Sequence, residues 1–326
     1  EGKGYWLRFD ASGTTTIIGT PIDEYLNPKT QAFLKASNKL IPYLDQSQII
    51  IIRSTVYPNT VQILFDKISH KEEGEWHVAY CPERIIQGYS IKELKELPQI
   101  VSGLSNKAMV EASKLFGLLS PKIIHVPIKE AELVKLFTNA WRYIQFAVTN
   151  QFYMICEDSE VNYDTVRKAM VEGYERASQL PSAGFTAGPC LLKDTMQISS
   201  FYNNGFLLGH SAMMINEGLP NFIVNKLKSK HELRKRKIGI LGMAFKANVD
   251  DIRDSLSFKL SKILKFHGAE VFCSDEYAKN TSFISKEKLV KNSETVIIGA
   301  PHSVYKDLVI PKNKELIDLW NLLPEK

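Results

Sequence analysis

The sequence predicts an α/β protein with two parallel sheets joined by a helical part, and three observations predict it. Short apolar runs alternate with helical segments near both ends of the 326-residue chain. Continuously apolar strands of this kind are typical of parallel sheets, which are buried on both faces. Between the two α/β parts, apolar residues recur with the 3.6-residue period of a helix. A hydrophobic content of 44% with 24% charged residues is ordinary for a folded globular protein and excludes wholesale disorder or a fibrous chain.

The first α/β part contains three apolar runs with helical segments between them. The strands are expected over Thr14–Gly19, Ile49–Ile52 and Trp76–Tyr80, and the helices over about Pro28–Tyr43 and Asn59–Ser69. Each strand ends in a polar or proline-bearing loop: Thr20-Pro21, Arg53-Ser54-Thr55 and Cys81-Pro82-Glu83. Because parallel sheets bind ligands at the carboxyl ends of their strands, these loops are candidate ligand contacts.

The middle and last parts follow from the same patterns. Helices are expected over about Lys129–Cys156, Tyr163–Gly173 and Leu207–Leu227, with a loop of small residues over Leu180–Pro189. The last part is expected to begin with a strand that runs from Lys237 into a glycine turn within 237–246. Further strands are expected at 270–273, 295–299 and near 315–319, with a helix over about Ser255–His267. A helix as long as the first of these often joins domains or packs against a second subunit. The expected domains are therefore residues 1–127, 128–232 and 233–326.

Charge, apolar runs and cysteines exclude several classes of protein. The net charge of +5 is too small to indicate a nucleic-acid partner, and it suits a local pocket for an anionic small molecule. No run approaches the roughly 18 apolar residues of a membrane span, and no signal peptide is evident. The four cysteines lack Cys-x-x-Cys spacing, so neither a metal site nor a disulfide framework is expected, and the reducing cytoplasm is the expected location.

Cys190 is the first candidate for chemistry. It follows a loop of small residues, which lets a ligand approach the backbone closely, and it precedes Lys193 and Asp194. Lys193 could favour the nucleophilic thiolate, and Asp194 could hold or activate a water molecule. The alternative is that Cys190 is an inert, buried small residue.

Three further groups are candidates, each with a plain structural alternative. Lys135 and Asn139 share a helix face, where they could point a cation and an amide at a developing oxyanion or simply form a solvated stripe. Glu83, at a strand end, could orient a substrate or act as a base. The Gly242 turn leads to Lys246 and Arg253, which suit phosphate, although a glycine turn alone is weak evidence.

These segments, in this order, resemble the UDP-glucose/GDP-mannose (nucleotide-sugar) 6-dehydrogenase family. The resemblance covers about residues 14–322, and it leans toward the UDP-N-acetylmannosamine type. The matching segments are Thr20-Pro21, Ser54-Thr55-Val56, Cys81-Pro82-Glu83-Arg84, Ala131 to Leu136 with Asn139, Cys190 to Asp194, Gly242 to Lys246, and Asp251 to Ser255. The resemblance implies two Rossmann-like sheets, the first incomplete, and a central helical domain for dimerisation and substrate.

The resemblance also implies an activity: oxidation of the C6 alcohol of a UDP-sugar to a carboxylate with NAD, for polysaccharide precursors. Cys190 would form a thiohemiacetal and then a thioester with the sugar carbon. The other implied catalytic residues are Lys135, Asn139, Asp194, Thr55 and Glu83. The implied substrate contacts are Arg176, Phe185, Ala187, Phe245 and Lys246, and the implied NAD contacts are Thr20, Pro21, Ser54, Lys193 and Arg253. The expected partners are a nucleotide sugar and a second copy of the chain, with no nucleic acid or membrane.

One departure concerns the amino-terminal part. The family's Gly-x-Gly-x-x-Gly turn and its ribose-binding acidic residue cannot be placed in this sequence, and Gly2, Gly4 and Gly13 lack the required spacing. We therefore expect that the first half of the NAD-binding domain is missing. Because a helix N-terminus in that half would bind the pyrophosphate, we expect little or no dehydrogenase activity from the chain.

Smaller departures leave the sugar open, and other functions remain possible. Gln87, Leu192 and Trp320-Asn321 differ from residues common in UDP-glucose enzymes and lean away from that substrate. A catalytically inactive protein that only binds UDP-sugar is one alternative. A 6-phosphogluconate or 3-hydroxyacid type of dehydrogenase, which needs no nucleophilic cysteine, is another, and replacement of Cys190 distinguishes it.

Overall fold

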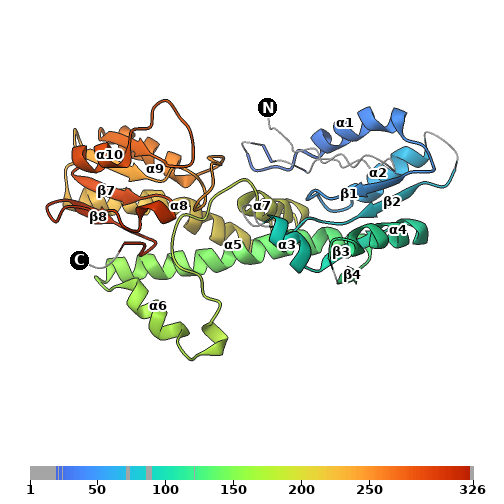
Figure 1. Cartoon of the computed structure of the whole chain (residues 1–326), viewed down its shortest axis with the longest axis horizontal. Helices are drawn as coiled ribbons and strands as arrows, with labels where there is room; N and C mark the ends of the chain where they lie inside the picture. The colour runs from blue at the N-terminus through green and yellow to red at the C-terminus, as the bar shows by residue number, and fades with distance from the viewer. Residues whose placement is uncertain are drawn as a thin grey trace. The chain divides into compact units, whose positions relative to one another are not determined.

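The chain folds as two compact units. The computed structural model describes residues 20, 22, 23, 25–70, 74–85, 90–120 and 122–323. The first unit comprises Glu1–Ala140 with Lys193–Phe206, and the second comprises Trp141–Leu192 with Leu207–Lys326. Two helices contribute residues to both units: α5 (Ile128–Asp158) and α7 (Leu191–Phe201). Figure 1 shows the elements along the chain. The predicted strand over 14–19, Pro21 and Gln87 lie outside the described residues.

The first unit contains a four-stranded sheet in the order β1-β2-β3-β4. Its strands are β1 (Ile49–Ile52), β2 (His77–Tyr80), β3 (Gln99–Gly103) and β4 (Ile123–His125). β1 pairs with β2, and β3 with β4, in parallel, but β2 and β3 are antiparallel, with Tyr80 opposite Ser102. The predicted strand over Ile49–Ile52 is therefore confirmed, and one strand pair departs from the expected parallel order.

Side chains of β1 and β2 alternate between two apolar layers, which cover the two faces of this sheet. One layer includes Ile50, Ile52 and Val78 and packs on α1 (Thr30–Leu40) and α2 (Thr60–Ser69). The other includes Ile51 and Ala79 and packs on α4 (Asn106–Gly117). The unit also has the short helix α3 (Ser90–Glu96) and a 3₁₀ turn, Ile41–Tyr43. Each fully buried isoleucine contributes about 1.5–3 kcal/mol, so these strands anchor the unit.

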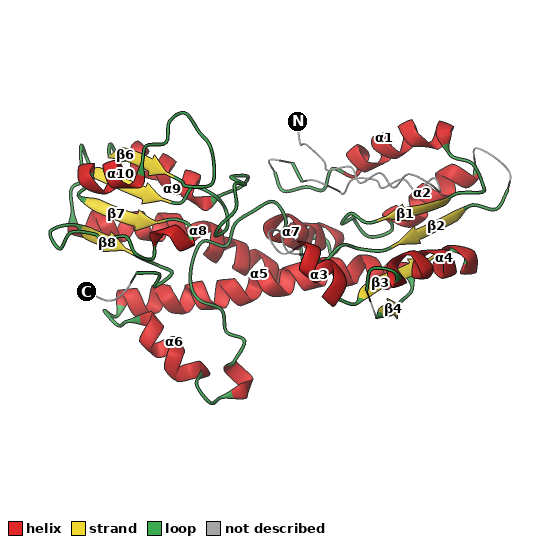
Figure 2. Ribbon diagram, viewed as in Figure 1, coloured by secondary structure: helices red, strands yellow, loops and turns green. Residues whose placement is uncertain are grey.

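The second unit contains a parallel sheet in the order β6-β5-β7-β8. Its strands are β5 (Lys237–Leu241), β6 (Glu270–Ser274), β7 (Thr295–Ile298) and β8 (Glu315–Ile317). Helices α8 (Leu207–Lys230) and α9 (Leu256–Phe266) share one apolar layer with β5, and α10 (Lys286–Asn292) shares the other (Figure 2). The unit is completed by α6 (Tyr163–Val171) and two 3₁₀ turns, Glu175–Ala177 and Ser303–Tyr305. The predicted α/β class with two sheets and a long central helix is confirmed.

The helices of the described residues include none that is both long and apolar enough to cross a membrane. The longest, α5, has 31 residues, but its sequence mixes apolar positions with charged ones such as Lys129, Glu132 and Lys135. It was predicted over Lys129–Cys156, so its ends differ from the prediction by one or two residues.

Candidate functional site

Asp194 is the centre of a buried polar cluster in the first unit. Only 1% of the residue is exposed. Its Oδ2 accepts a hydrogen bond of 2.5 Å from Asn139 Nδ2, and its Oδ1 forms an ion pair with Lys193 Nζ. A buried carboxylate is stable only when it is paired and hydrogen-bonded, and these two partners provide both. The structure therefore brings together three residues that the sequence singled out, and it fixes the orientation of the Asn139 amide.

Thr20 joins this cluster to the loop that follows β1. The residue is 1% exposed. Its carbonyl oxygen accepts hydrogen bonds from Gln197 Nε2 (3.0 Å) and Lys193 Nζ (3.4 Å). Its N–H donates to the Thr55 carbonyl (3.0 Å), and its Oγ1 accepts from the Tyr57 N–H (3.2 Å). Thr20 thus acts inside the unit as a link between α7 and the loop that carries Ser54 and Thr55, both half-buried.

Glu83, after β2, is held by neighbouring groups. Its Oε2 forms an ion pair with Arg53, and its Oε1 accepts hydrogen bonds from the N–H groups of Arg84 (2.7 Å) and Ile85 (2.9 Å). Arg53 also lies over the ring of Phe116, with Cζ 4.5 Å from its centroid. Burial lowers the pKa of Arg53 to about 10, so it stays charged at neutral pH. Both carboxylate oxygens of Glu83 are therefore engaged, which favours a positioning role over that of a base.

Glu132 lies in the segment from Ala131 to Leu136, and in the structure its side chain holds a loop in place. Its side chain is buried, and its two oxygens accept hydrogen bonds from the N–H groups of Asn59 (2.7 Å) and Val61 (3.0 Å). These N–H groups lie at the start of α2, where helical donors lack partners within the helix. Burial raises the pKa of Glu132, although these hydrogen bonds oppose the shift. Glu132 therefore fastens the Thr55–Asn59 loop to α5, the helix of Lys135 and Asn139.

In the second unit, Asn150 holds the loop that precedes Cys190. Asn150 Oδ1 accepts the Gly184 N–H (3.0 Å), and Asn150 Nδ2 donates to the Gly184 carbonyl (3.1 Å). The same Nδ2 donates to Asn216 Oδ1 (2.9 Å), and Asn216 Nδ2 donates to the Tyr143 carbonyl (3.0 Å). Asn150, Asn216 and Tyr143 have no exposed surface. This amide chain was not predicted, because Asn150 lies between Thr149 and Gln151 and nothing in the sequence distinguishes it from them.

Two glycines bring the same loop against aromatic rings. Gly184 has φ +151°, and a Cβ there would come within 2.2 Å of the Trp320 ring. Gly188 has φ +104°, and a Cβ there would come within 2.6 Å of Phe245. Only glycine permits both this backbone conformation and this approach. The loop therefore contacts the unit's sheet domain through Trp320 and Phe245.

The remaining predicted residues of the second unit differ in exposure. Cys190 is exposed, is not in a disulfide and directly precedes α7. Phe185 is 5% exposed and belongs to the apolar core, so it supports the loop from within. Arg176 is exposed, stacks on Tyr174 at 4.8 Å and borders a hollow of about 440 Å³ with Trp141.

Ala187, Phe245 and Lys246 are half-buried, and Arg253 is exposed. Arg253 forms an ion pair of 2.6 Å with Asp251. Phe245 donates its N–H to the Asp251 carbonyl (3.0 Å), so the segment that carries these residues is folded on itself.

Comparison with known proteins gives matches along nearly the whole chain. Three models of the UDP-glucose/GDP-mannose dehydrogenase family match: the NAD binding domain at residues 10–117, the central domain at 129–217 and the UDP binding domain at 239–325. The UDP-N-acetyl-D-mannosamine dehydrogenase of Methanocaldococcus jannaschii is 30% identical, over 89% of this chain and 70% of that protein. That of Methanococcus vannielii is 31% identical, with the same coverage of each chain. The chain belongs to the UDP-glucose/GDP-mannose dehydrogenase family.

A solved structure agrees with this assignment. The UDP-D-ManNAc dehydrogenase from Pyrococcus horikoshii matches with a TM-score of 0.87 at 27% identity, over 95% of this chain and 78% of that one. Members of the UDP-glucose/GDP-mannose dehydrogenase family are NAD-dependent oxidoreductases, so the predicted enzyme class and cofactor are confirmed. The domain boundaries at 127/128 and 232/233 stay a prediction.

One expectation is wrong. The family's NAD binding domain is matched at residues 10–117, so the expected absence of its amino-terminal half is not borne out. The expectation of little or no activity rested on that absence and loses its support. The sequence argument relied on one glycine fingerprint, whereas the match extends over β1, β2 and the helices that pack on them.

The residues after β1 and β2 fit a bound dinucleotide. β1 and β2 are parallel, so both strands end at the edge of the sheet where such sheets bind nucleotides. Ser54 and Thr55 follow β1 there with half-buried hydroxyl side chains, which suit the hydroxyl and amide groups of NAD. Lys193 donates to the Thr20 carbonyl, and the Thr20 N–H donates to the Thr55 carbonyl, so both residues help to hold that loop in place.

Proposed function

We propose that the protein oxidises the C6 alcohol of a UDP-sugar to a carboxylate in two NAD-dependent steps, and that the sugar is N-acetylmannosamine. The relatives named for this substrate support the choice of sugar. The main support for this reaction is the arrangement of residues at the start of α7. An exposed cysteine precedes this helix, and Asp194, four residues later, is held by Asn139 and Lys193.

The covalent route runs through Cys190. The first oxidation converts the C6 alcohol to an aldehyde. The Cys190 thiolate then adds to the aldehyde carbon, and the resulting oxyanion takes up a proton to give a thiohemiacetal. Loss of a hydride and that proton gives a thioester, and water cleaves it to the carboxylate and the thiol. NAD, when bound, accepts the hydride in each oxidation. N–H groups at the start of a helix favour a thiolate, so the position of Cys190 before α7 suits this role.

The polar residues of the first unit have supporting roles in this proposal. Lys135 supplies a fixed positive charge for the oxyanion that forms when the thiolate adds. Asn139 assists with its amide, whose orientation Asp194 fixes. Because both oxygens of Asp194 are engaged, Asp194 acts by holding Asn139 and Lys193. Thr55 and Glu83 shape the loops that position the substrate and a water molecule.

The substrate contacts lie in the second unit. We assign the nucleotide to Phe245 and Lys246, on the segment that begins at Gly242. The UDP binding domain of the family is matched there, which supports the assignment. Ala187 and Arg176 contact the sugar nucleotide, and Phe185 supports Ala187 from the core. Arg253 is assigned to the cofactor.

We further propose that the protein forms a homodimer or a larger homo-oligomer through α5. Five large apolar residues on this helix are substantially exposed: Phe137 (52%), Trp141 (59%), Val148 (40%), Phe152 (37%) and Ile155 (54%). They recur at intervals of three, four and seven, so they share one face of the helix. A contiguous exposed apolar face of this kind marks an interaction surface, and a second copy covers it symmetrically.

The function is tested by following NADH absorbance with UDP-N-acetylmannosamine and, for comparison, UDP-glucose. The wild-type protein is expected to form two NADH per sugar. Cys190→Ser is expected to abolish or stall the second oxidation, because serine is a far weaker nucleophile. Cys156→Ala is the matched control, since Cys156 is half-buried and is also outside any disulfide.

Three outcomes would contradict the proposal in different ways. An unchanged rate in Cys190→Ser would exclude the covalent route and favour a dehydrogenase of the 6-phosphogluconate type. UDP binding without any NADH would favour a protein that only binds UDP-sugar. Turnover of UDP-glucose in preference to UDP-N-acetylmannosamine would refute the choice of sugar alone.

A further inference from the structure

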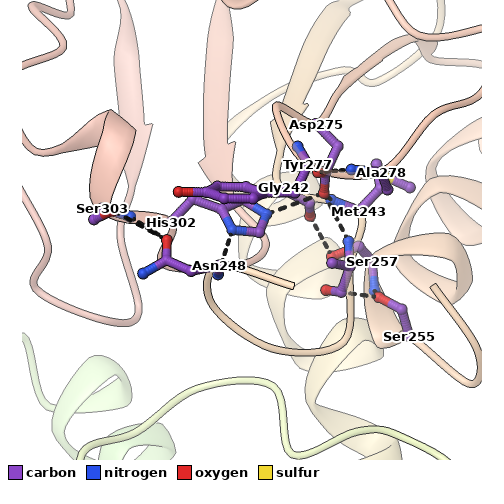
Figure 3. A network of polar contacts seen from close by, with 11 residues as sticks. Gly242, Met243, Asn248, Ser255, Ser257, Asp275, Tyr277, Ala278, His302 and Ser303 are labelled. Atoms are coloured by element: carbon purple, nitrogen blue, oxygen red, sulfur yellow. Dashed lines mark hydrogen bonds and ion pairs between the residues drawn. The ribbon is translucent and has the colours of Figure 1, made fainter. Parts of the chain in front are cut away.

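Asp275, the residue after β6, has a buried carboxylate that binds the start of the loop following β5. Its side chain has no exposed surface, and neither has that of His302. Asp275 Oδ2 accepts hydrogen bonds from the N–H groups of Met243 (2.7 Å) and Ala244 (2.8 Å) and from His302 Nε2 (3.0 Å). Figure 3 shows these contacts converging on one carboxylate from the ends of three strands, β5, β6 and β7.

The second oxygen of Asp275 is satisfied as fully as the first. Oδ1 accepts hydrogen bonds from the N–H groups of Tyr277 (2.8 Å) and Ala278 (2.7 Å), so five donors surround the carboxylate. Burial alone would raise the pKa of Asp275, but hydrogen bonds from His302 and from backbone N–H groups, including those of Ala278 and Ala244, outweigh it and lower the pKa to about 2. Asp275 is therefore an anion held mainly by backbone N–H groups.

His302 is neutral in this arrangement and extends it to the middle of the loop. The Asn248 backbone N–H, which can only donate, lies 2.8 Å from His302 Nδ1, so Nδ1 accepts and the proton is on Nε2. The ring therefore donates to Asp275 and accepts from Asn248. Asn248 Oδ1 in turn accepts from the N–H (2.9 Å) and hydroxyl (3.1 Å) of Ser303, and the Tyr277 ring lies against His302 at 4.8 Å.

The position of this anion matches that of a ligand in related folds. In dinucleotide-binding sheets, the first turn after the central strand directs its N–H groups at a pyrophosphate. Here the equivalent turn follows β5, and Gly242 has φ +90° there. A Cβ at this position would also collide with the Ala300 backbone, so the turn requires glycine. The N–H groups of Met243 and Ala244, which a phosphate would use, are bound to Asp275 instead.

We propose that Asp275 is a positioning residue for nucleotide binding, in which a carboxylate of the protein occupies the place of a phosphate. It fixes the 242–254 loop, which carries Phe245, Lys246 and Arg253, and it occupies the N–H groups of Met243 and Ala244 that a pyrophosphate would use. The second sheet therefore holds a nucleotide through side chains of this loop and does not take a dinucleotide in the usual manner. The inference rests on the proposed function, because it assigns UDP to this unit.

The first arm of the test needs no nucleotide. Hydrogen exchange in the peptide spanning 242–254 is compared among the wild type, Asp275→Asn and Ser285→Ala. Ser285 caps α10 in the same unit by accepting the Lys288 N–H (3.3 Å), so its loss is a control for lowered stability away from the loop. Asp275→Asn is expected to raise the exchange rate of the peptide about tenfold or more, and Ser285→Ala to leave it unchanged. An unchanged rate in Asp275→Asn overturns the proposal.

The second arm measures UDP affinity by calorimetry and steady-state kinetics. Asp275→Asn is expected to weaken UDP binding about tenfold and to raise KM for the UDP-sugar by a similar factor, while kcat changes less than KM. Looser exchange with unchanged UDP affinity overturns the proposal. If the wild type fails to bind UDP, the proposed function is refuted, and the exchange arm still decides whether Asp275 fixes the loop.

His302 provides a second pair of variants should Asp275→Asn fail to fold. A glutamine carries one donor and one acceptor, as the neutral imidazole does, whereas a leucine carries neither. His302→Gln is therefore expected to retain UDP affinity, and His302→Leu to lose about tenfold. Equal UDP affinities for the two variants overturn the proposal.

Discussion

Removal of the Asn150 side chain should loosen the loop before Cys190. In Asn150→Ala, the Gly184 N–H and Asn216 Oδ1 lose these partners in a buried region, and the Gly184 carbonyl keeps only the Thr186 hydroxyl at 3.5 Å. Leaving one buried polar group unsatisfied costs about 1–3 kcal/mol. Two such groups set a range of about 2–6 kcal/mol, and water entering the vacated space brings the expected loss toward the lower end, about 3 kcal/mol.

The assay is hydrogen exchange in the peptide spanning 181–189, because the Gly184 N–H is itself one of the affected groups. A local loss of about 3 kcal/mol corresponds to exchange roughly a hundredfold faster. Thr138→Val is the control, since Thr138 Oγ1 donates to the Val134 carbonyl within its own helix. Asn150→Ala should also change the rate at which Cys190 is alkylated relative to the wild type, since the loop leads directly into that residue.

A loss below about 1 kcal/mol in Asn150→Ala would refute this reasoning, because it would mean that the amide chain is dispensable for the loop. Asn150→Asp provides a second check. It keeps an acceptor for the Gly184 N–H but brings a charge against two other acceptors, so it should be at least as damaging as alanine. A milder effect of aspartate would show that donation to Gly184 and Asn216 contributes little.

Two further predictions concern the second unit. Because the folded pKa of Asp275 is about 2 against an ordinary 3.8, its contribution of about 2 kcal/mol is present above pH 4 and is lost as pH falls toward 2. Other carboxylates titrate in the same range, so urea midpoints should drop more steeply in the wild type than in Asp275→Asn, and parallel curves would contradict this. Gly188→Ala places a Cβ against Phe245 at a positive φ, which costs about 1–3 kcal/mol. UDP titration of this variant should show weaker binding than the wild type. Wild-type affinity would show that Phe245 does not contribute to the nucleotide site.

The sequence predicts elements well where packing alone decides them. β1 is four consecutive isoleucines, and it has the expected bounds because a run of this kind is stable only when buried. α5 follows its apolar period to within two residues at each end. β3 was missed because Gln99 and Ser102 interrupt its apolar pattern, yet both are buried, at 4% and 0% exposure.

α7 was missed for a related reason. Asp194, Thr195, Gln197 and Ser199 give it a polar appearance, but all four are buried. Their partners, such as Asn139 and the Thr20 carbonyl, are distant in the sequence. A polar residue indicates an exposed position only when the protein interior offers it no hydrogen-bond partner. A single sequence does not reveal whether such a partner exists.

The sequence predicted those residues of the candidate site that belong to recognisable motifs. The motifs named Cys190 and the residues around Asp194, because chemistry restricts the side chains that can serve there. They did not name Asn150 or Asp275, whose partners are largely backbone N–H and carbonyl groups in loops. Every residue has a backbone carbonyl group and almost every residue has an N–H group, so a hydrogen bond to the backbone leaves no signal in the sequence. Contacts of this kind are identified only from the structure.

The reversal between β2 and β3 has a consequence for how the first unit can vary. Since β3 runs opposite to β2, the chain leaves β2 at Cys81 and enters β3 after Pro98 at the same edge of the sheet. A parallel arrangement would have required a helix on one side to bring the chain back. Within this connection, Cys81 belongs to the apolar layer on α4 and Glu83 is held by Arg53, whereas the described side chains of α3, at 92–96, belong to neither apolar layer. Substitutions at 92–96 are therefore expected to leave both layers of the first unit intact.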